Sequence, residues 1–199
     1  MNDPQPVTEV PGPAGDPGRH PARAALDRDY AALARPPASV GSLELIVRRA
    51  QDGRHEPLDH VRLTMERGVP GDRWERKSPV LPEAQITVMR RDVAELIANG
   101  QPITLFGDNL FVDLDLSATN LPTGTRLQVG EAIVEVTPKP HNGCVKFRAR
   151  FGGDALDFVS EKATRPQNLR GIYWRVIESG EVRVGDGIRV ITRTAPPRT

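Results

Sequence analysis

The sequence predicts a mostly β, barrel-like fold with two or three short helices. Short apolar or alternating runs recur about every ten residues over residues 41–193, separated by Gly, Pro, Asn and Asp. Helical periodicity is confined to short stretches. A chain of 199 residues with 38% hydrophobic residues is long enough for one domain with a core of its own.

Composition divides the chain into four parts. Residues 1–21 are rich in Pro and Gly and carry few large apolar side chains, so they are predicted to be disordered. Residues 22–40 are predicted to form a short helix and a linker, and residues 41–193 the main domain. Residues 194–199 are predicted to be a flexible tail.

Three stretches predict helices. In the first, Leu26, Tyr30 and Leu33 share one helical face, and two prolines follow. The second helix is predicted over residues 92–98, capped by its aspartate and closed by an Asn-Gly pair. The third is predicted over residues 154–161.

Roughly eight or more short strands are predicted from alternation and β-branched residues. Gly130 and Glu131 form the expected hairpin turn between two of them. The segments are 42–48, 60–65, 85–89, 111–116, 127–129, 133–136, 172–177, 182–184 and 188–192.

Several functional classes lack their sequence signatures. The chain has no glycine fingerprint for a dinucleotide, no phosphate-binding loop, no Cys-x-x-Cys pair and no nucleophile elbow. The four histidines do not match zinc-ligand spacing. A formal net charge of +1 gives no bulk attraction to nucleic acid.

Location follows from similar exclusions. No apolar stretch approaches the roughly 18 residues that span a bilayer, so no membrane partner is expected. The N-terminus lacks the pattern of a secretory signal. The single cysteine cannot form an internal disulfide, which favours a reducing, cytoplasmic location.

The most informative stretch surrounds the only cysteine, Cys144. Two prolines and an Asn-Gly pair predict an irregular turn immediately before it. Residues 138–153 contain no acidic residue, and neither do residues 163–175. The basic residues of these two runs are Lys139, Lys146, Arg148, Arg150, Arg165, Arg170 and Arg175, with His141 in the first run.

If the two runs converge, they form a cationic pocket suited to a phosphate or another anion. Such a field stabilises the thiolate of Cys144, which can attack an electrophile, carry sulfane sulfur or bind a soft metal. The alternative is that Cys144 is a small buried hydrophobic residue and that the arginines form a solvated face.

Seven segments resemble one known family in order along the chain. They are GDRW at 71–74, QITV at 85–88, LFGDNL at 105–110, LPTG with LQVG within 121–130, HNGC with KF within 141–147, NLRG at 168–171 and GEVRVGD at 180–186. On these segments, residues 41–193 resemble the MOSC domain, named for the C-terminal domain of molybdenum cofactor sulfurase. The resemblance implies a β-barrel-like fold of the MOSC type and a role around the molybdenum cofactor, molybdopterin.

The resemblance also implies site residues. Cys144 becomes a sulfur carrier or a ligand of the molybdenum ion, while basic and polar residues hold the pterin phosphate. His141 and Arg148, which lie near Cys144 in the first acid-free run, are added to the residues that the resemblance implies. The candidate cofactor contacts are therefore Arg73, Asn109, His141, Lys146, Arg148, Asn168 and Arg170.

The chain also departs from some members of that family. It shows no additional β-rich N-terminal domain, no iron–sulfur domain and no pyridoxal-phosphate domain, although pyridoxal phosphate binding is associated with the family. The expected partners are therefore a small anionic cofactor and either an electron-donating reductase or a cysteine desulfurase. The HNGC loop differs from the proline-rich cysteine loop of the molybdenum-ligating reductases.

Three functions follow as hypotheses. The first is a molybdenum-cofactor protein in which Cys144 ligates the metal and supports reduction of N-hydroxylated compounds with a partner reductase. The second is a sulfurtransferase that carries sulfane sulfur as a Cys144 persulfide. The third is a non-catalytic module that binds a small anion or a partner, with Cys144 merely packed.

Overall fold

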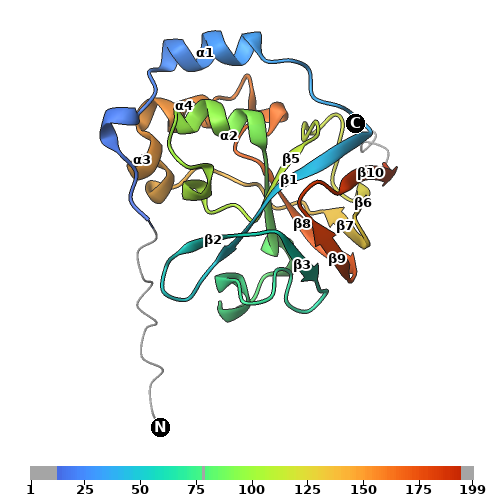
Figure 1. The fold of residues 1–199 in the computed structure, drawn as a ribbon. Coiled ribbons are helices and arrows are strands. Elements are labelled where there is room, and N and C mark those ends of the chain that lie inside the picture. The colour runs from blue at the N-terminus through green and yellow to red at the C-terminus, as the bar shows by residue number, and fades with distance from the viewer. Residues whose placement is uncertain (1–12, 78, 194–199) are drawn as a thin grey trace.

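The computed structural model of the chain describes residues 13–77 and 79–193 (Figure 1). The helices within these residues are α1 (Arg23–Ala32), α2 (Arg91–Ala98), α3 (Val145–Phe151) and α4 (Gly153–Ser160). The strands are β1 (Val40–Arg49), β2 (His55–Leu58), β3 (His60–Leu63), β4 (Ile86–Arg90), β5 (Leu110–Asp113), β6 (Arg126–Val129), β7 (Ala132–Val136), β8 (Ile172–Glu178), β9 (Gly180–Arg183) and β10 (Gly187–Thr192). Short 3-10 turns are η1 (Pro17–Arg19), η2 (Arg73–Arg76), η3 (Pro82–Ala84), η4 (Ile103–Phe106) and η5 (Arg165–Gln167).

Seven of these strands close into a barrel, which confirms the predicted β-barrel fold. The order is β1, β10, β6, β7, β8, β4, β5 and back to β1. The long strand β1 closes the ring because its first residues pair with β10 and its middle pairs with β5. The pairing of β4 with β5 is parallel, since α2 and η4 form the crossover between them.

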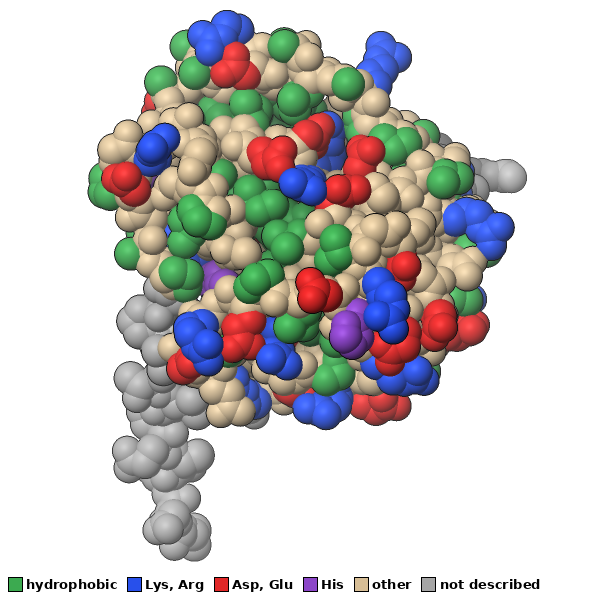
Figure 2. Space-filling model, viewed as in Figure 1, with side chains coloured by type: hydrophobic (Ala, Val, Ile, Leu, Met, Phe, Trp, Pro, Cys, Tyr) green, Lys and Arg blue, Asp and Glu red, His purple; other side chains and the backbone are tan. Residues whose placement is uncertain are grey.

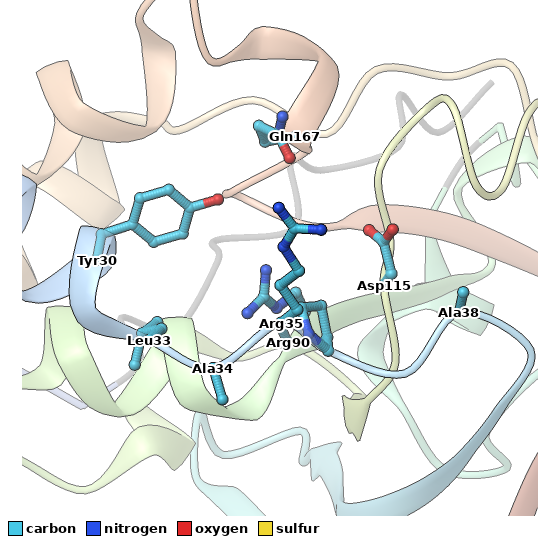
Figure 3. A pocket seen from close by; sticks show the side chains of 9 residues that line it. Tyr30, Leu33, Ala34, Arg35, Ala38, Arg90, Asp115 and Gln167 are labelled. Carbon is cyan, nitrogen blue, oxygen red and sulfur yellow. The ribbon is translucent and has the colours of Figure 1, made fainter.

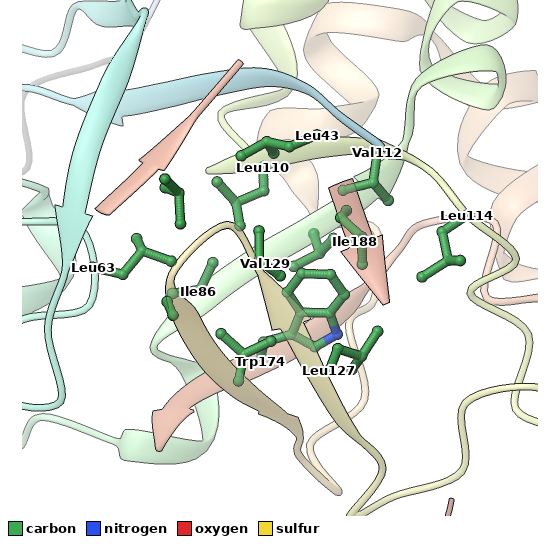
Figure 4. Packing of buried hydrophobic residues seen from close by; sticks show 14 of the residues in the cluster. Leu43, Leu63, Ile86, Leu110, Val112, Leu114, Leu127, Val129, Trp174 and Ile188 are labelled. Atoms are coloured by element: carbon green, nitrogen blue, oxygen red, sulfur yellow. The ribbon is translucent and has the colours of Figure 1, made fainter. Parts of the chain in front are cut away.

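The barrel interior is filled by apolar side chains that alternate along the strands (Figure 4). Trp174 of β8 is fully buried there and lies beside Leu127 and Val129 of β6. On β4, Ile86 and Val88 point inward, and the residue that follows each faces the opposite side. This two-residue period is the one that the sequence pattern predicts.

A second apolar core lies between the outside of the barrel and the helices, which gather on one side of it (Figure 1). The outward side chains of the strands contribute Val47, Met89 and Phe111 to this core. Helices α3 and α4 contribute Phe147, Phe151 and Phe158, and α1 contributes Leu26. Because β4 is covered on both faces, all of its residues are buried, including Thr87 and Arg90.

Three features differ from the sequence expectation: helix α3, strand β2 and the N-cap of α2. Helix α3 is a fourth helix, formed directly after the irregular turn expected before Cys144, in residues for which the sequence predicts no helix. Its Phe147 and Phe151 are spaced i, i+4 and face the second core. Strand β2 contains Pro57, which argues against a strand, but β2 pairs only with β1 at the edge of the sheet, where proline is tolerated. Asp92 lies inside the first turn of α2 and pairs with Arg90, so it is not the N-cap.

Residues 13–21, assigned to the predicted disordered segment, lie against the domain instead; residues 1–12 of that segment and the predicted tail lie outside the described residues. The backbone N–H of Asp16 donates to the Gln101 side chain at 2.7 Å, and Arg150 donates to the Pro13 carbonyl at 3.0 Å. The Asn99 side chain donates to the Arg19 carbonyl at 3.1 Å. We call residues 13–21 the strap. These hydrogen bonds to the domain offset the entropy cost of ordering a segment with little apolar surface.

The helices of the described part are seven to ten residues long, and none of them is long and apolar enough to cross a membrane.

Gly171, which begins the approach to β8, provides a test of this packing. Its φ is +97°, and a Cβ there would lie 2.1 Å from the Val88 carbonyl oxygen of β4. Gly185 has a similar φ of +92° with no atom within 4 Å of its Cβ position. We therefore expect Gly185→Ala to cost roughly 1–3 kcal/mol of unfolding free energy from backbone strain alone. Gly171→Ala should cost a further 1–3 kcal/mol or so, because the added methyl group overpacks β4.

Chemical denaturation of the two variants and the parent protein measures the difference. Equal destabilisation of both variants would contradict the close approach of Gly171 to β4.

Candidate functional site

A pocket of about 180 Å³ lies where α3 meets the barrel, and Cys144 lines it. We call it the thiol pocket. Among the described residues that line it, none is acidic and six are Lys or Arg. The six cationic residues are Arg49, Arg73, Lys77, Lys146, Arg150 and Arg170. The two acid-free runs of the sequence therefore do converge, and they are joined by cations from β1 and η2.

Cys144 is solvent-exposed and precedes the first turn of α3. Its neighbours in the pocket include His141 and Asn142 from the loop after β7. An exposed thiol is accessible to a reactant or a metal, and it is not the small packed hydrophobic residue of the third sequence hypothesis.

A buried ion pair with Asp72 holds Arg49 at the wall of the thiol pocket. The Arg49 Nε and backbone N–H both donate to Asp72 Oδ2 at 2.8 Å. Burial disfavours the charge on Asp72, but the Coulomb attraction of Arg49 and its hydrogen bonds outweigh burial and hold the pKa of Asp72 below its usual value. Asp72 also accepts from the backbone N–H of Trp74 at 2.9 Å, which orders η2 and so positions Arg73.

Asn109 completes this network from behind the pocket. Its amide donates to Asp72 at 3.0 Å and to the Val47 carbonyl at 3.2 Å. Its side-chain oxygen accepts from Arg49 at 3.0 Å and from the Thr87 hydroxyl at 3.0 Å. All of these groups are buried, so Asn109 holds β1 and β4 together.

A second buried carboxylate, Asp108, anchors Arg170. Arg170 Nη1 donates to Asp108 Oδ2 at 2.7 Å, and its guanidinium lies over the Phe147 ring at 5.2 Å. Complete burial raises the pKa of Asp108, and the nearby Arg170 charge only partly offsets this effect. The cation–π contact and the ion pair hold Arg170 at the wall of the pocket.

His141 lies beside Asp108, with 3.6 Å between His141 Nε2 and Asp108 Oδ1. Its ring packs on Tyr173, with 4.6 Å between the ring centroids. Burial, and then the charges of Arg170 and Arg49, hold the pKa of His141 well below its usual value, so the imidazole is neutral at physiological pH. His141 Nδ1 and Asp108 Oδ1 are buried and have no hydrogen-bond partner among the described residues.

Arg150 lies close enough to the other cations of the pocket for their charges to repel. Its Nη1 donates to the Leu105 carbonyl at 2.8 Å, and its Nε donates to the strap. Burial, followed by the charge of Arg73, lowers the pKa of Arg150. Cations crowded in this way repel one another, and a bound anion relieves the repulsion.

The structure places some predicted site residues in the pocket and others outside it. Cys144, Arg73, His141, Lys146 and Arg170 line it together. The other three predicted contacts do not line it.

Each of those three has another environment. Asn109 is buried in the network behind the pocket. Asn168 has a φ of +51°, ends η5 and donates to the Leu116 carbonyl at 2.8 Å, so it shapes the turn before Arg170. Arg148 is exposed on α3 and points elsewhere, because α3 turns its Lys146 and Arg150 to the pocket.

Sequence reasoning did not select Arg49, Lys77 or Tyr173 as site residues. Arg49 ends a strand and follows another arginine, Arg48, and nothing in the local pattern shows which of the two is buried. Asp72 and Asp108, the carboxylates that hold Arg49 and Arg170, occur in the GDRW and LFGDNL segments. These two segments were therefore the only sequence signal that pointed to the buried ion pairs.

The described residues contain no group of three or more His, Cys, Asp or Glu side chains arranged to hold a metal ion.

The Arg49–Asp72 pair predicts a pH-dependent stability. The carboxylate of Asp72 has a lower pKa in the folded than in the unfolded chain, so its contribution is fully present above about pH 4 and is lost as pH falls through the folded pKa. We expect Asp72→Asn to cost roughly 3–5 kcal/mol at neutral pH, because it leaves Arg49 buried without a counter-charge.

The difference in unfolding free energy between the parent and Asp72→Asn should shrink on acidification, as measured by denaturation at a series of pH values. Asp52→Asn is the control, since its pair with Arg54 is solvent-exposed and should matter little. A difference that stays constant down to strongly acid pH would show that the pair is not ionised as described.

Comparison with known proteins identifies the family of this fold. The model of the MOSC domain family matches residues 74–189, more than half of the chain. No curated protein matches the chain by sequence. The crystal structure of the YuaD protein from Bacillus subtilis is similar, with a TM-score of 0.53, 18% identity and coverage of 76% of this chain and 95% of that one.

The crystal structure of YiiM from Escherichia coli is also similar, with a TM-score of 0.51, 21% identity and coverage of 78% of this chain and 72% of that one. At these identities the two structures support the fold alone. The family match covers every residue that lines the thiol pocket except Arg49 and Arg73, and the chain belongs to the MOSC domain family.

Proposed function

We propose that this MOSC protein binds the anionic end of the molybdenum cofactor in the thiol pocket, with Cys144 as a metal ligand. In this role it supports the reduction of N-hydroxylated compounds with electrons from a partner reductase in the cytoplasm. The observation that carries the proposal is the convergence of six cationic side chains and an exposed thiol in one pocket.

The residues of the pocket fit the charge of such a cofactor. Arginine forks and lysine ammonium groups are the usual protein partners of phosphate. The buried, unpartnered His141 Nδ1 is a further polar atom that a ligand can satisfy. Burial, and then the charge of Arg73, lower the pKa of Arg150, and a bound anion would offset the repulsion from Arg73.

The size of the pocket limits how much of the cofactor it holds. Pockets that enclose drug-sized ligands have volumes of roughly 300–1,000 Å³. The thiol pocket, at about 180 Å³, therefore suits the phosphate and the atoms next to it better than a whole pterin.

The chain's own residues would divide the work as follows. Arg73, Lys146 and Arg170 bind the phosphate, while Arg49 stays in its pair with Asp72. His141, neutral at physiological pH, offers one donor and one acceptor nitrogen to the ligand. The thiolate of Cys144 is a soft ligand for a metal. When bound, the cofactor supplies a metal centre that changes its oxidation state.

The first test is elemental analysis of protein purified from a host that makes the cofactor. We expect molybdenum in the parent protein, loss of the metal in Cys144→Ser and lower occupancy in Lys146→Gln. Arg148→Gln is the matched control, because Arg148 lies on the same helix outside the pocket. Metal-free parent protein from such a host would contradict the proposal.

The exposure of Cys144 also favours a second candidate function, sulfur transfer. The Cys144 thiolate would attack the outer sulfur of a persulfide on a cysteine desulfurase. A new S–S bond forms on Cys144, the donor S–S bond breaks, and the donor cysteine leaves as a thiolate.

Intact-mass spectrometry tests this second function. After incubation with a desulfurase and cysteine, the parent protein should gain the mass of one sulfur atom, and a reductant should remove it. Cys144→Ser should gain nothing. An unmodified parent protein would exclude sulfur transfer from that class of donor. This result would not affect the test of cofactor binding by elemental analysis.

A further inference from the structure

A second pocket, of about 430 Å³, lies between the linker after α1 and the barrel (Figure 3). We call it the linker pocket. It shares no lining residue with the thiol pocket. The residues that line it are Tyr30, Leu33, Ala34, Arg35, Pro36, Ala38, Arg90, Asp115 and Gln167.

One part of this lining is apolar. Leu33 and Pro36, with two alanines of the linker, contribute aliphatic surface, and Tyr30 adds an aromatic ring. Packing of that ring edge-on against Phe158, with 5.6 Å between centroids, fixes its orientation. A flat apolar group therefore has a preformed surface on which to lie.

The other part is polar, and its groups converge. In Figure 3 the Tyr30 hydroxyl and the Gln167 amide point into the same space, Asp115 lies opposite Tyr30, and two guanidinium groups lie between them. Among the described residues, the Tyr30 hydroxyl, the Gln167 amide and the Arg35 guanidinium make no side-chain hydrogen bond or ion pair. A hollow with apolar walls and a few convergent polar groups is the usual form of a small-molecule site.

Arg90 gives the strongest indication of a ligand. Its side chain is 7% exposed, and its Nε donates to Asp92 Oδ1 at 3.0 Å. The pair with Asp92 occupies Nε and Nη2, which leaves Nη1 without a partner among the described residues. A buried guanidinium with an unused donor beside a cavity is a site for an acceptor group of a ligand.

The charges select the class of ligand. Asp92 neutralises Arg90, so among the lining residues the ion pairs of the described part leave Arg35 as the unmatched positive charge and Asp115 as the unmatched negative charge. Asp115 accepts from the Ser117 backbone N–H through Oδ1 and has its second oxygen for another donor. The complement is an organic anion with one negative group for the arginines, a flat apolar body for Tyr30 and a donor group for Asp115.

We propose that the linker pocket is a second ligand site, which binds a small aromatic carboxylate that carries a hydroxyl or amino group. Its volume lies within the range of roughly 300–1,000 Å³ for small-molecule sites. The site does not depend on molybdenum or on Cys144, so it stands or fails apart from the proposed function of the thiol pocket.

The test is calorimetric titration of the full chain with 4-hydroxybenzoate as the probe, and with phenyl phosphate to compare the two anionic groups. We expect saturable binding of 4-hydroxybenzoate to the parent protein and binding at least about fivefold weaker in Arg35→Gln, which loses a charged donor. Tyr30→Phe should weaken it to a smaller degree, since the ring remains. Arg35 is exposed in the linker, so its replacement should leave the fold intact.

Controls separate this site from the rest of the surface. Arg165→Gln removes an exposed arginine of η5 that does not line the pocket, and Cys144→Ser alters only the thiol pocket. Both should bind the probe as the parent does. Three results would overturn the proposal: no saturable binding, equal binding by Arg35→Gln, or a loss of binding in Arg73→Gln but not in Arg35→Gln. Tighter binding of phenyl phosphate than of the carboxylate would also overturn the assigned ligand class.

Discussion

The buried pair of Arg49 and Asp72, joined by Asn109, is the interaction on which the site depends. It links the end of β1 to η2, and through Asn109 and Thr87 it reaches β4. Ion pairs of this kind contribute little net stability, because taking two charges out of water costs about as much as their attraction returns. The pair instead fixes the position of η2, which carries Arg73. The buried carboxylate of Asp72 finds its hydrogen-bond donors only when η2 lies against the end of β1.

The thiol pocket is built in two electrostatic layers. Two carboxylates, Asp72 and Asp108, lie fully buried behind it, and each holds one arginine of the wall. The cations line the pocket in front of these carboxylates. On the molecular face in Figure 2, by contrast, acidic and basic side chains are interspersed. The concentration of one sign of charge in the pocket is therefore a local arrangement in a chain of formal net charge +1.

Much of the fold could be predicted because the two-residue period of strands is a local property. Ile86 and Val88 alternate with their neighbours in the sequence as they do in the barrel. Helix α3 was not predicted because seven residues hold only one repeat of the helical period, Phe147 and Phe151, and the cations between them dominate the pattern. The order of the strap rests on single hydrogen bonds to distant residues such as Gln101, which leave no trace in local composition.

The sequence by itself determined that this chain is a barrel-like protein of the MOSC family with one thiol amid acid-free, basic runs, because strand periodicity, turn residues and ordered motifs are encoded locally. Only the tertiary structure decided which charged groups meet. It buried Arg49 and left its neighbour Arg48 partly exposed, brought Arg170 to Asp108 across 62 positions, and turned Arg148 away from the pocket that Lys146 lines. The physical reason is that burial and charge pairing depend on distances between residues far apart in the chain, which barrel closure and helix packing fix only once the whole domain has folded.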